Sequence, residues 1–419
     1  MKKILLLLIF IVTLSACTPP PKAEDIYSQT SGVIEKIENG KITVNTENER
    51  IEIVYNDAKA SDTGKNITID YKNGEIENIN IYGVPFESEA EEIIEEMTLE
   101  EKVGQLFLVR YPHSGAEDIA KNYNIGGFVL FARDFENETP ESILEEISLC
   151  QQASKYPMLM AVDEEGGIVV RVSKFSQFRE KPFPSPSYLY EEGGFDAITN
   201  DTYEKCNLLK SIGINVNLAP VADVSTDKRD YIYNRTTGLD AEGTSEYIKT
   251  VVSVMKEEKT GSVLKHFPGY GNNTDTHTGI AVDKRDYNSF LSSDFLPFIA
   301  GIESGADSIL VSHNIVESID SERPASLSPK AHDILRNVLG FNGVVMTDDL
   351  DMSAITQYTD SEGAAIDAIK AGNDMVICSD YKTQINAVIN AVNSGEISEK
   401  TINKAVQRVI IWKLKLDLI

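Results

Sequence analysis

The chain has 419 residues, with 39 lysines and arginines against 66 aspartates and glutamates, so its formal net charge is −27. A protein this acidic repels polyanions, and we expect no binding to nucleic acid, which requires a basic surface. The length suits one large domain plus a minor module. Three cysteines, Cys150, Cys206 and Cys378, are widely spaced in apolar surroundings, which predicts buried thiols and excludes a disulfide framework.

The first 17 residues form an export signal. They combine a basic start, an apolar run too short for a lasting membrane span, and small residues before Cys17. The ending L-S-A-C resembles the bacterial lipobox, in which the cysteine receives lipid after cleavage; a plain secretory leader is the alternative. We expect residues 1–17 to be a lipoprotein signal peptide and residues 18–25, with three consecutive prolines, to be a stiff tether. The protein would then be anchored through Cys17 to the outer face of the cytoplasmic membrane.

Residues 26–86 show a β pattern. Apolar and polar residues largely alternate in five runs, and Asn39-Gly40 and Asn73-Gly74 are typical of tight hairpin turns. The five runs are Val33–Ile37, Ile42–Val44, Ile51–Tyr55, Ile67–Tyr71 and Ile76–Ile81. We predict a small antiparallel β domain, either a barrel or a sheet, that serves as a spacer or docking module.

From residue 87 to 419, short apolar runs alternate with amphipathic segments. The predicted strands are Leu106–Val109, Gly127–Phe131, Met158–Val162, Val216–Leu218, Val263–Leu264, Ser308–Val311, Val344–Met346 and Met375–Ile377. The predicted helices between them include Ser142–Ala153, Thr202–Ser211, Tyr247–Glu258, Asp294–Ser304, Ala331–Val338 and Ser361–Lys370. This α/β alternation predicts a (β/α)8 barrel. An open doubly wound sheet would need a glycine-rich phosphate loop after its first strand, and the sequence has none there.

Polar residues follow these predicted strands, and the carboxyl ends of barrel strands meet on one face. They are Arg110, Arg133, Asp163, Asp223, Lys265, His266, His313, Asp348, Asp349 and Cys378. Carboxylates placed directly after buried strands need partners, which the basic residues supply. The sequence therefore predicts a charged mouth above an apolar core.

The third predicted strand continues as A-V-D-E-E-G-G-I-V-V-R. Its two glycines allow a tight turn, and Asp163 and Arg171 could present a carboxylate and a guanidinium to vicinal hydroxyls. A purely structural Asp–Arg pair is the alternative. Asp223, after the fourth strand, is interpreted as holding loops together, and Arg235 is a loop arginine.

The segment from Lys265 to Asp283 begins K-H-F-P-G-Y-G-N-N-T-D-T-H. Pro268, Gly269 and Gly271 prevent a regular element from continuing, so we expect a strand that runs into a loop after Lys265 and His266. Asp275 and His277 are two residues apart, close enough for the carboxylate to orient the imidazole as a proton donor. The alternative is an Asp turn beside a solvated histidine.

The seventh predicted strand, G-V-V-M-T-D-D-L-D-M, places Asp348 at its tip. Because side chains alternate along a strand, we expect only one of Asp348 and Asp349 to face inward. Asp348 is the candidate nucleophile, since a carboxylate facing a cationic pocket stays ionised. Asp349 is interpreted as the N-cap of the next helix.

Four motifs occur in order: D-E-E-G-G-x-V-x-R, N-x-A-P-V-x-D-V, K-H-F-P-G-x-G-x-x-x-x-D-T-H and T-D-D-L-x-M. Together they resemble the glycoside hydrolase family 3 β-N-acetylglucosaminidases, the bacterial branch that trims cell-wall muropeptides. The D-T-H loop is the most specific part, because other family 3 β-glucosidases lack it. The chain departs from the family around Arg235, where the loop reads N-R-T-T-G and the family more often has an aromatic residue.

The resemblance implies a retaining double displacement. Asp348 would be the nucleophile, and His277, oriented by Asp275, would be the acid and then the base, in place of the usual second carboxylate. The residues that would hold the sugar are Asp163, Arg171, Arg235, Lys265 and His266. His313 would have a supporting role.

The predicted function is an exo-acting β-N-acetylglucosaminidase of cell-wall fragments, with a carbohydrate substrate, no cofactor and no metal. A β-glucosidase or a β-N-acetylglucosaminide phosphorylase on the same barrel is the alternative. A further alternative is a non-catalytic lipoprotein that binds wall glycan through its N-terminal module. The sequence leaves the oligomeric state open.

Overall fold

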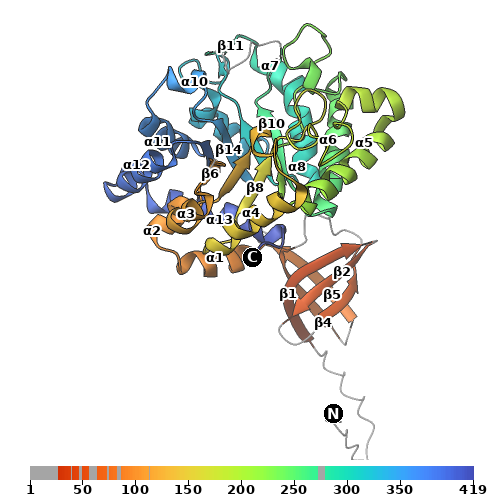
Figure 1. The fold of residues 1–419 in the computed structure, drawn as a ribbon. Helices are drawn as coiled ribbons and strands as arrows, with labels where there is room; N and C mark the ends of the chain where they lie inside the picture. The colour runs from red at the N-terminus through yellow and green to blue at the C-terminus, as the bar shows by residue number, and fades with distance from the viewer. Residues whose placement is uncertain are drawn as a thin grey trace, which may run out of the picture.

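The computed structural model describes residues 27–38, 40–46, 50–55, 64–72, 75–82, 86–112, 114–271 and 279–419. Figure 1 shows a small sheet followed by a large α/β barrel. The predicted signal peptide, the lipidation site at Cys17 and the whole of the predicted tether lie outside these residues, as do the turn residues Asn39, Asn73 and Gly74. Among the described residues, no helix has the length and apolar character needed to cross a membrane.

The N-terminal module is an antiparallel sheet of five strands in the order β3-β2-β1-β4-β5. Its strands are β1 (Tyr27–Glu38), β2 (Lys41–Thr46), β3 (Arg50–Val54), β4 (Asn66–Lys72) and β5 (Glu75–Tyr82). One face buries a small cluster that includes Ile34, Ile42, Val44, Ile67 and Ile69. Alternate residues face this cluster, which explains the period of two in the sequence. Of the two predicted forms, the module is the sheet.

Eight parallel strands close into a barrel, which confirms the predicted fold class. The strands are β6 (Phe107–Arg110), β7 (Gly127–Leu130), β8 (Leu159–Val162), β9 (Val216–Asn217), β10 (Gly261–Phe267), β12 (Ser308–Val311), β14 (Val344–Asp349) and β15 (Met375–Cys378). Each pairs with its neighbour in sequence, and β15 pairs with β6 to close the ring. A short parallel pair, β11 (Val282–Asp283) and β13 (Ile315–Val316), lies outside the barrel strands.

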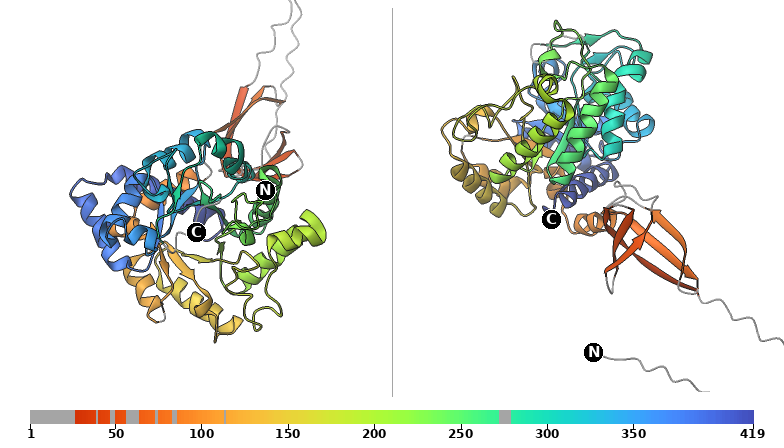
Figure 2. Two further views of the ribbon diagram at one scale, coloured as in Figure 1. Left: turned by 90° about the horizontal axis from the view of Figure 1, so that it is seen from above. Right: turned by 90° about the vertical axis from the view of Figure 1, so that its right-hand side faces the viewer.

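Helices surround the strands in the view from above (Figure 2). The α-helices are α1 (Glu87–Glu95), α2 (Leu99–Gly104), α3 (Ala116–Tyr123), α4 (Pro140–Ala153), α5 (Pro186–Ser211), α6 (Ala241–Glu257), α7 (Tyr287–Ser289), α8 (Phe295–Ser304), α9 (Pro329–Asp333), α10 (Ser353–Thr356), α11 (Ser361–Ala371), α12 (Tyr381–Asn393) and α13 (Glu399–Lys415). Short 3₁₀ segments are η2 (Ala132–Asp134), η3 (Tyr233–Arg235) and η5 (Ala325–Leu327), and π-helical segments are η4 (Phe290–Asp294) and η6 (Ile334–Val338).

Local sequence sets the helix ends. Side chains of Thr139, Ser185, Asp240, Asp360 and Ser398 accept hydrogen bonds from the first turns of α4, α5, α6, α11 and α13. The predicted helix Thr202–Ser211 was too short, because α5 already begins at Pro186, with Ser185 as its N-cap. The non-helical pair Gly193 and Gly194 interrupts this helix and hides its periodicity.

The core has two layers. The barrel interior is filled by residues such as Leu108, Leu218, Leu310 and Met346, and a second layer packs between the strands and the helices. Trp412 of α13 belongs to the interior cluster and is 2 % exposed. Its indole approaches Gly261 at the start of β10, so α13 covers the N-terminal end of the barrel. In Figure 1 the small sheet lies on this side, near α1 and α13, and the opposite end remains for a site.

The three described cysteines, Cys150, Cys206 and Cys378, are free and buried, which confirms the prediction of buried thiols. Burial makes the largest contribution to raising the pKa of each thiol above its ordinary value. A thiol held in its neutral form is a poor nucleophile and a poor metal ligand, so these residues serve the core.

Candidate active site

The candidate site lies at the carboxyl end of the barrel strands. Asp163 directly follows β8, and Asp348 is the last residue but one of β14. Lys265 and His266 are inside β10, which runs from Gly261 to Phe267, so the strand is longer at both ends than the predicted range Val263–Leu264. The strand continues because Phe267 still pairs with Val311 of β12.

The turn after β8 is fixed by Glu164, which is fully buried. Its carboxylate accepts hydrogen bonds from the backbone N–H groups of Arg171 and Val172, both at 2.8 Å, and from the hydroxyl of Ser173. Gly166 has φ +104°, and a Cβ there would lie 2.3 Å from the Pro184 carbonyl oxygen. Only glycine fits this position, so the glycine and Glu164 set the shape of the turn that presents Asp163 and Glu165.

Lys265 joins the two carboxylates of this turn. Its Nζ lies 2.7 Å from Asp163 Oδ1 and 2.6 Å from Glu165 Oε1, and its side chain is 3 % exposed. The guanidinium of Arg235, on η3, completes the cluster: Nε is 2.9 Å from Glu165 Oε2 and NH2 is 2.8 Å from Oε1. A bidentate pair of this kind has a fixed geometry. Glu165 thus ties the ends of β8 and β10 to the connection that follows β9.

Charge compensation keeps Glu165 ionised. Burial alone would raise the pKa of this carboxyl, but the charges and hydrogen bonds of Arg235 and Lys265 outweigh that effect, and the pKa lies below its usual range. Glu165 was not among the predicted site residues. The available signal was its place beside Asp163 in the E-E-G-G turn, whereas its partners stand 70 and 100 positions further along the chain.

His266 is held between Asp223 and Arg235. Its Nδ1 lies 2.7 Å from Asp223 Oδ2, and its Nε2 lies 2.9 Å from Arg235 NH2. A guanidinium can only donate, so Nε2 accepts and the hydrogen of the ring sits on Nδ1, facing the carboxylate. His266 is 4 % exposed. Its hydrogen bond with Arg235 holds the imidazole at the site and also orients the guanidinium.

Asp223 holds the segment on both sides of His266. It accepts from the backbone N–H of His266 at 3.1 Å and of Tyr270 at 2.7 Å, and is 1 % exposed. These bonds match the loop-holding role interpreted from the sequence. Tyr270 packs edge-on against the His266 ring, with centroids 5.1 Å apart.

Asp163 and Arg171 are the most open members of this group. Their side chains are 16 % and 29 % exposed, and Arg171 NH2 lies 3.8 Å from Asp163 Oδ2. Arg171 Nε has no hydrogen-bond partner among the described residues. A carboxylate and a guanidinium side by side, both partly open, can bind neighbouring hydroxyl groups of a sugar.

A register shift changes the expected direction of Asp349. Met346 pairs with Met375 of β15, but Asp349 pairs with Ile377, so β14 contains one extra residue in this interval. Asp349 forms an ion pair with Arg110 of β6. The prediction that Asp349 caps the next helix was wrong, because α10 starts after Met352 and has no side-chain cap.

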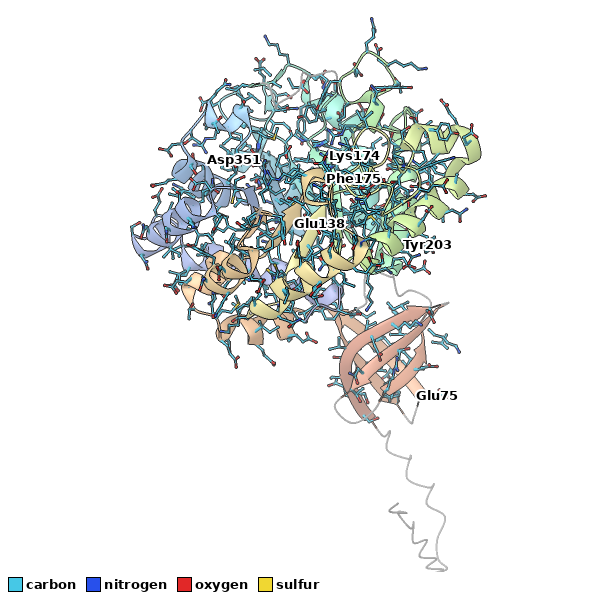
Figure 3. The ribbon with its side chains drawn as sticks, viewed as in Figure 1. Glu75, Glu138, Lys174, Phe175, Tyr203 and Asp351 are labelled. Atoms are coloured by element: carbon cyan, nitrogen blue, oxygen red, sulfur yellow. The ribbon has the colours of Figure 1, made fainter. Side chains whose placement is uncertain are left out.

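The structure therefore brings together Asp163, Arg171, Arg235, Lys265 and His266, and it places Asp348 on the same end of the barrel. Asp275 and His277 lie outside the described residues. Figure 3 shows Lys174 and Phe175, shortly after Arg171, and Asp351, shortly after Asp349, on the half of the barrel away from Glu75 of the small sheet. Among the described residues, no group of three His, Cys, Asp or Glu side chains is arranged to hold a metal ion.

A family model, "Glycosyl hydrolase family 3 N terminal domain", matches residues 98–411. The chain belongs to glycoside hydrolase family 3. As a member of this family it is a glycoside hydrolase, and the matched region contains the barrel with its charged mouth. The small sheet precedes the matched region.

Relatives of this family 3 enzyme include a β-hexosaminidase from Nitrosomonas eutropha, 33 % identical over 264 residues, which cover 61 % of this chain and 74 % of the relative. A family 3 β-N-acetylglucosaminidase from Paenibacillus sp. str. FPU-7 superposes with a TM-score of 0.72 at 27 % identity, over 77 % of this chain and 63 % of that one. A β-N-acetylhexosaminidase from Beutenbergia cavernae gives 0.67 at 27 % identity, over 75 % and 98 %. This chain thus spans less than two thirds of the Paenibacillus enzyme.

Proposed function

We propose that this family 3 enzyme is a retaining exo-β-N-acetylglucosaminidase that removes terminal β-linked N-acetylglucosamine from cell-wall muropeptides or related glycans. The observation that carries the proposal is the placement of a strand-borne aspartate, Asp348, on the same barrel end as the cluster built from Asp163, Glu165, Lys265 and Arg235. The names of the hexosaminidase relatives support the choice of an N-acetylated sugar.

In the first step, an oxygen of Asp348 forms a bond to the anomeric carbon while the bond from that carbon to the aglycone oxygen breaks. The electron pair leaves with the aglycone oxygen, which takes a proton from His277. In the second step, His277 removes a proton from water, the water oxygen attacks the anomeric carbon, and the bond to Asp348 breaks. Two displacements retain the β configuration.

The described residues contribute orientation and charge. Asp163 and Arg171 would bind hydroxyl groups of the terminal sugar, and Lys265 and Arg235 hold the carboxylates that frame it. Because Lys265 and Arg235 are already paired and largely buried, they lose little side-chain entropy on binding. The charges of Lys265 and Arg235 also hold the pKa of Glu165 below its usual range, so this carboxylate stays ionised.

A panel of nitrophenyl glycosides, assayed with and without inorganic phosphate, tests the reaction. We expect turnover of the β-N-acetylglucosaminide, little turnover of the β-glucoside, and free sugar as the product in both buffers. A sugar 1-phosphate product would make the enzyme a phosphorylase, and a preference for the glucoside would make it a β-glucosidase.

Covalent labelling tests the nucleophile. An activated fluoro-sugar should label Asp348 at a stoichiometry of one, and Asp348→Asn should abolish both labelling and turnover. Label found on Asp163, Glu164, Glu165 or Asp349 would assign the nucleophile elsewhere.

We also propose that the protein is a lipoprotein on the outer face of the cytoplasmic membrane. The support is the L-S-A-C sequence at Cys17 and the proline-rich stretch behind it. Labelling of cells with radioactive palmitate should mark the wild-type protein and not Cys17→Ala. Equal palmitate labelling of both, or of neither, would contradict lipidation at Cys17.

A further inference from the structure

Asp349, the residue after the proposed nucleophile, is held at four points. Its backbone N–H donates to Asp348 Oδ1 at 2.8 Å, and its backbone carbonyl lies 3.0 Å from His313 Nε2. Its carboxylate accepts from the backbone N–H of Asp351 at 2.9 Å and pairs with Arg110. Asp349 is 7 % exposed. Of these four contacts, the hydrogen bond from the Asp349 N–H is the one made directly to Asp348. The contacts with His313, Asp351 and Arg110 therefore act on Asp348 through Asp349.

His313 is fully buried and its donor role is fixed by its partners. A backbone carbonyl only accepts, so Nε2 carries a hydrogen and donates it to Asp349. The other ring nitrogen lies 2.7 Å from the hydroxyl of Ser326, whose backbone N–H donates to Ser312 at 3.0 Å. His313 therefore ties the peptide of Asp349, on β14, to the end of the neighbouring strand β12.

Arg110 approaches Asp349 from the other side. It stands at the end of β6, and β15 lies between β6 and β14 in the barrel, so the ion pair crosses above β15. The guanidinium carbon lies 4.8 Å from the centre of the Phe131 ring, which limits its movement. Burial raises the pKa of Asp349, and Arg110 opposes part of this rise, as does the N–H of Asp351.

The register shift in β14 explains why these contacts are needed. An extra residue in one strand leaves the local backbone without regular ladder hydrogen bonds. The peptide between Asp348 and Asp349 lies in this irregular interval. Without contacts from β12 and β6, the backbone there would have several conformations, and only some would present Asp348 to a sugar.

We propose that Arg110 and His313 are positioning residues that fix Asp349 and, through its N–H, the carboxylate of Asp348. This inference rests on the proposed role of Asp348 as nucleophile. Neither residue needs to touch the substrate. Loss of either should slow attack by Asp348 without changing which residue attacks.

The experiment measures the rate constant for labelling of Asp348 by the activated fluoro-sugar in the full-length enzyme. Arg110→Met and His313→Leu remove the two contacts, whereas His313→Gln retains an N–H donor that can reach the Asp349 carbonyl. We expect the rate constant to fall by about 10- to 100-fold in Arg110→Met and His313→Leu, the range for a small misplacement of a reacting group. His313→Gln should recover much of the loss.

Two matched controls separate positioning from folding. Arg336 pairs with Asp374 at 2.5 Å, at the opposite end of the same barrel, so Arg336→Met removes an Arg–Asp pair that is more deeply buried than the pair of Arg110 and Asp349. His332 is 3 % exposed and donates to the Ser328 carbonyl at 2.8 Å, so His332→Leu removes another buried histidine. Partial unfolding lowers the fraction of enzyme that labels, but a misplaced nucleophile lowers the rate constant of the fraction that does label.

The outcomes distinguish the two proposals. Wild-type rate constants in Arg110→Met and His313→Leu, or equal losses in Arg336→Met and His332→Leu, would overturn the positioning role. If the wild-type enzyme labels at a residue other than Asp348, the proposed function itself fails. A slower rate in the two test variants, with unchanged controls and rescue by glutamine, would support the inference.

Discussion

The guanidinium of Arg235 and the carboxylate of Glu165 face each other in a bidentate pair, 2.9 Å from Nε to Oε2 and 2.8 Å from NH2 to Oε1. Their side chains are 11 % and 2 % exposed. A buried pair of this kind contributes little net stability compared with apolar residues, but removing one partner leaves the other charge buried and uncompensated. The pair therefore links the folding of two loops to the geometry of the site.

Glu165→Gln should be both less stable and less active than the wild type. The amide keeps the size of the side chain but leaves Arg235 and Lys265 with one carboxylate fewer, and we expect a loss of about 3 kcal/mol in the free energy of unfolding. Urea denaturation measures this loss, and the kcat/KM on an N-acetylglucosaminide measures the functional effect. Glu180→Gln, at an exposed position outside the site, should stay within about 0.5 kcal/mol of wild type.

The stability difference should also depend on pH. The pKa of Glu165 is lowered in the folded state from the ordinary value of 4.5, so its ionised form stabilises the fold above that pH. As the pH falls below 4.5, the unfolded chain takes up a proton that folded Glu165 resists, and this contribution declines. The gap between wild type and Glu165→Gln should therefore narrow in acid. A gap that widens in acid would contradict the assigned direction.

The sequence predicted which strands exist but not what their polar ends bind. Apolar runs of two to five residues mark the barrel strands because the runs are buried on both faces. Glu165 escaped prediction because its environment is created by Arg235 and Lys265, which arrive from other strand ends. Asp349 was misinterpreted for a similar reason, since the register shift that redirects it depends on its pairing with β15. Local patterns do not contain such distant partners.

Asp223→Asn should lower activity while largely keeping the fold. The asparagine oxygen can still accept from the backbone N–H of Tyr270, but an amide N–H in place of Asp223 Oδ2 would face the hydrogen on His266 Nδ1. The ring would then move its hydrogen to Nε2, where it meets Arg235, or would rotate away. We expect kcat/KM to fall by about 10- to 100-fold.

Asp227→Asn provides the comparison for this variant, because Asp227 is in the same connection after β9 and its side chain is 40 % exposed, paired with Arg229. Its kcat/KM should match the wild type. Thermal unfolding of Asp223→Asn should show one cooperative transition. An Asp223→Asn enzyme with wild-type kcat/KM would show that His266 does not depend on its carboxylate partner.

The loss of activity in His277→Ala should depend on how much the leaving group needs protonation. If His277 donates the proton to the departing oxygen, its loss should matter most for aglycones that need protonation, by roughly 10²- to 10⁴-fold, and little for a dinitrophenyl leaving group. Asp275→Asn should show the same trend more weakly. Measuring kcat/KM over a series of aryl glycosides gives the slope against leaving-group pKa. Equal losses for all leaving groups would show that His277 is not the acid. The acid role is inferred from the sequence, since His277 lies outside the described part of the chain.

Lys413 offers a test of stability at the end of the barrel opposite the site. It lies on α13, is fully buried, and donates from Nζ to Gln105 Oε1 at 2.6 Å. Burial lowers the pKa of this amine to about 7, from an ordinary value of 10.5. The unfolded chain therefore holds a proton between pH 7 and 10.5 that the folded chain releases, so stability falls as the pH decreases through this range and stays low below it.

Lys413→Met should remove this penalty while keeping most of the apolar contacts of the side chain. We expect the variant to be more stable than wild type by about 1–3 kcal/mol near pH 6, after allowing for the hydrogen bond lost by Gln105, and the gain should shrink toward pH 10. Activity should not change. Lys404→Met, on an exposed face of the same helix, should shift stability by less than about 0.5 kcal/mol at every pH. A stability gain in Lys413→Met that is constant from pH 6 to 10 would show that the buried amine is not the cause.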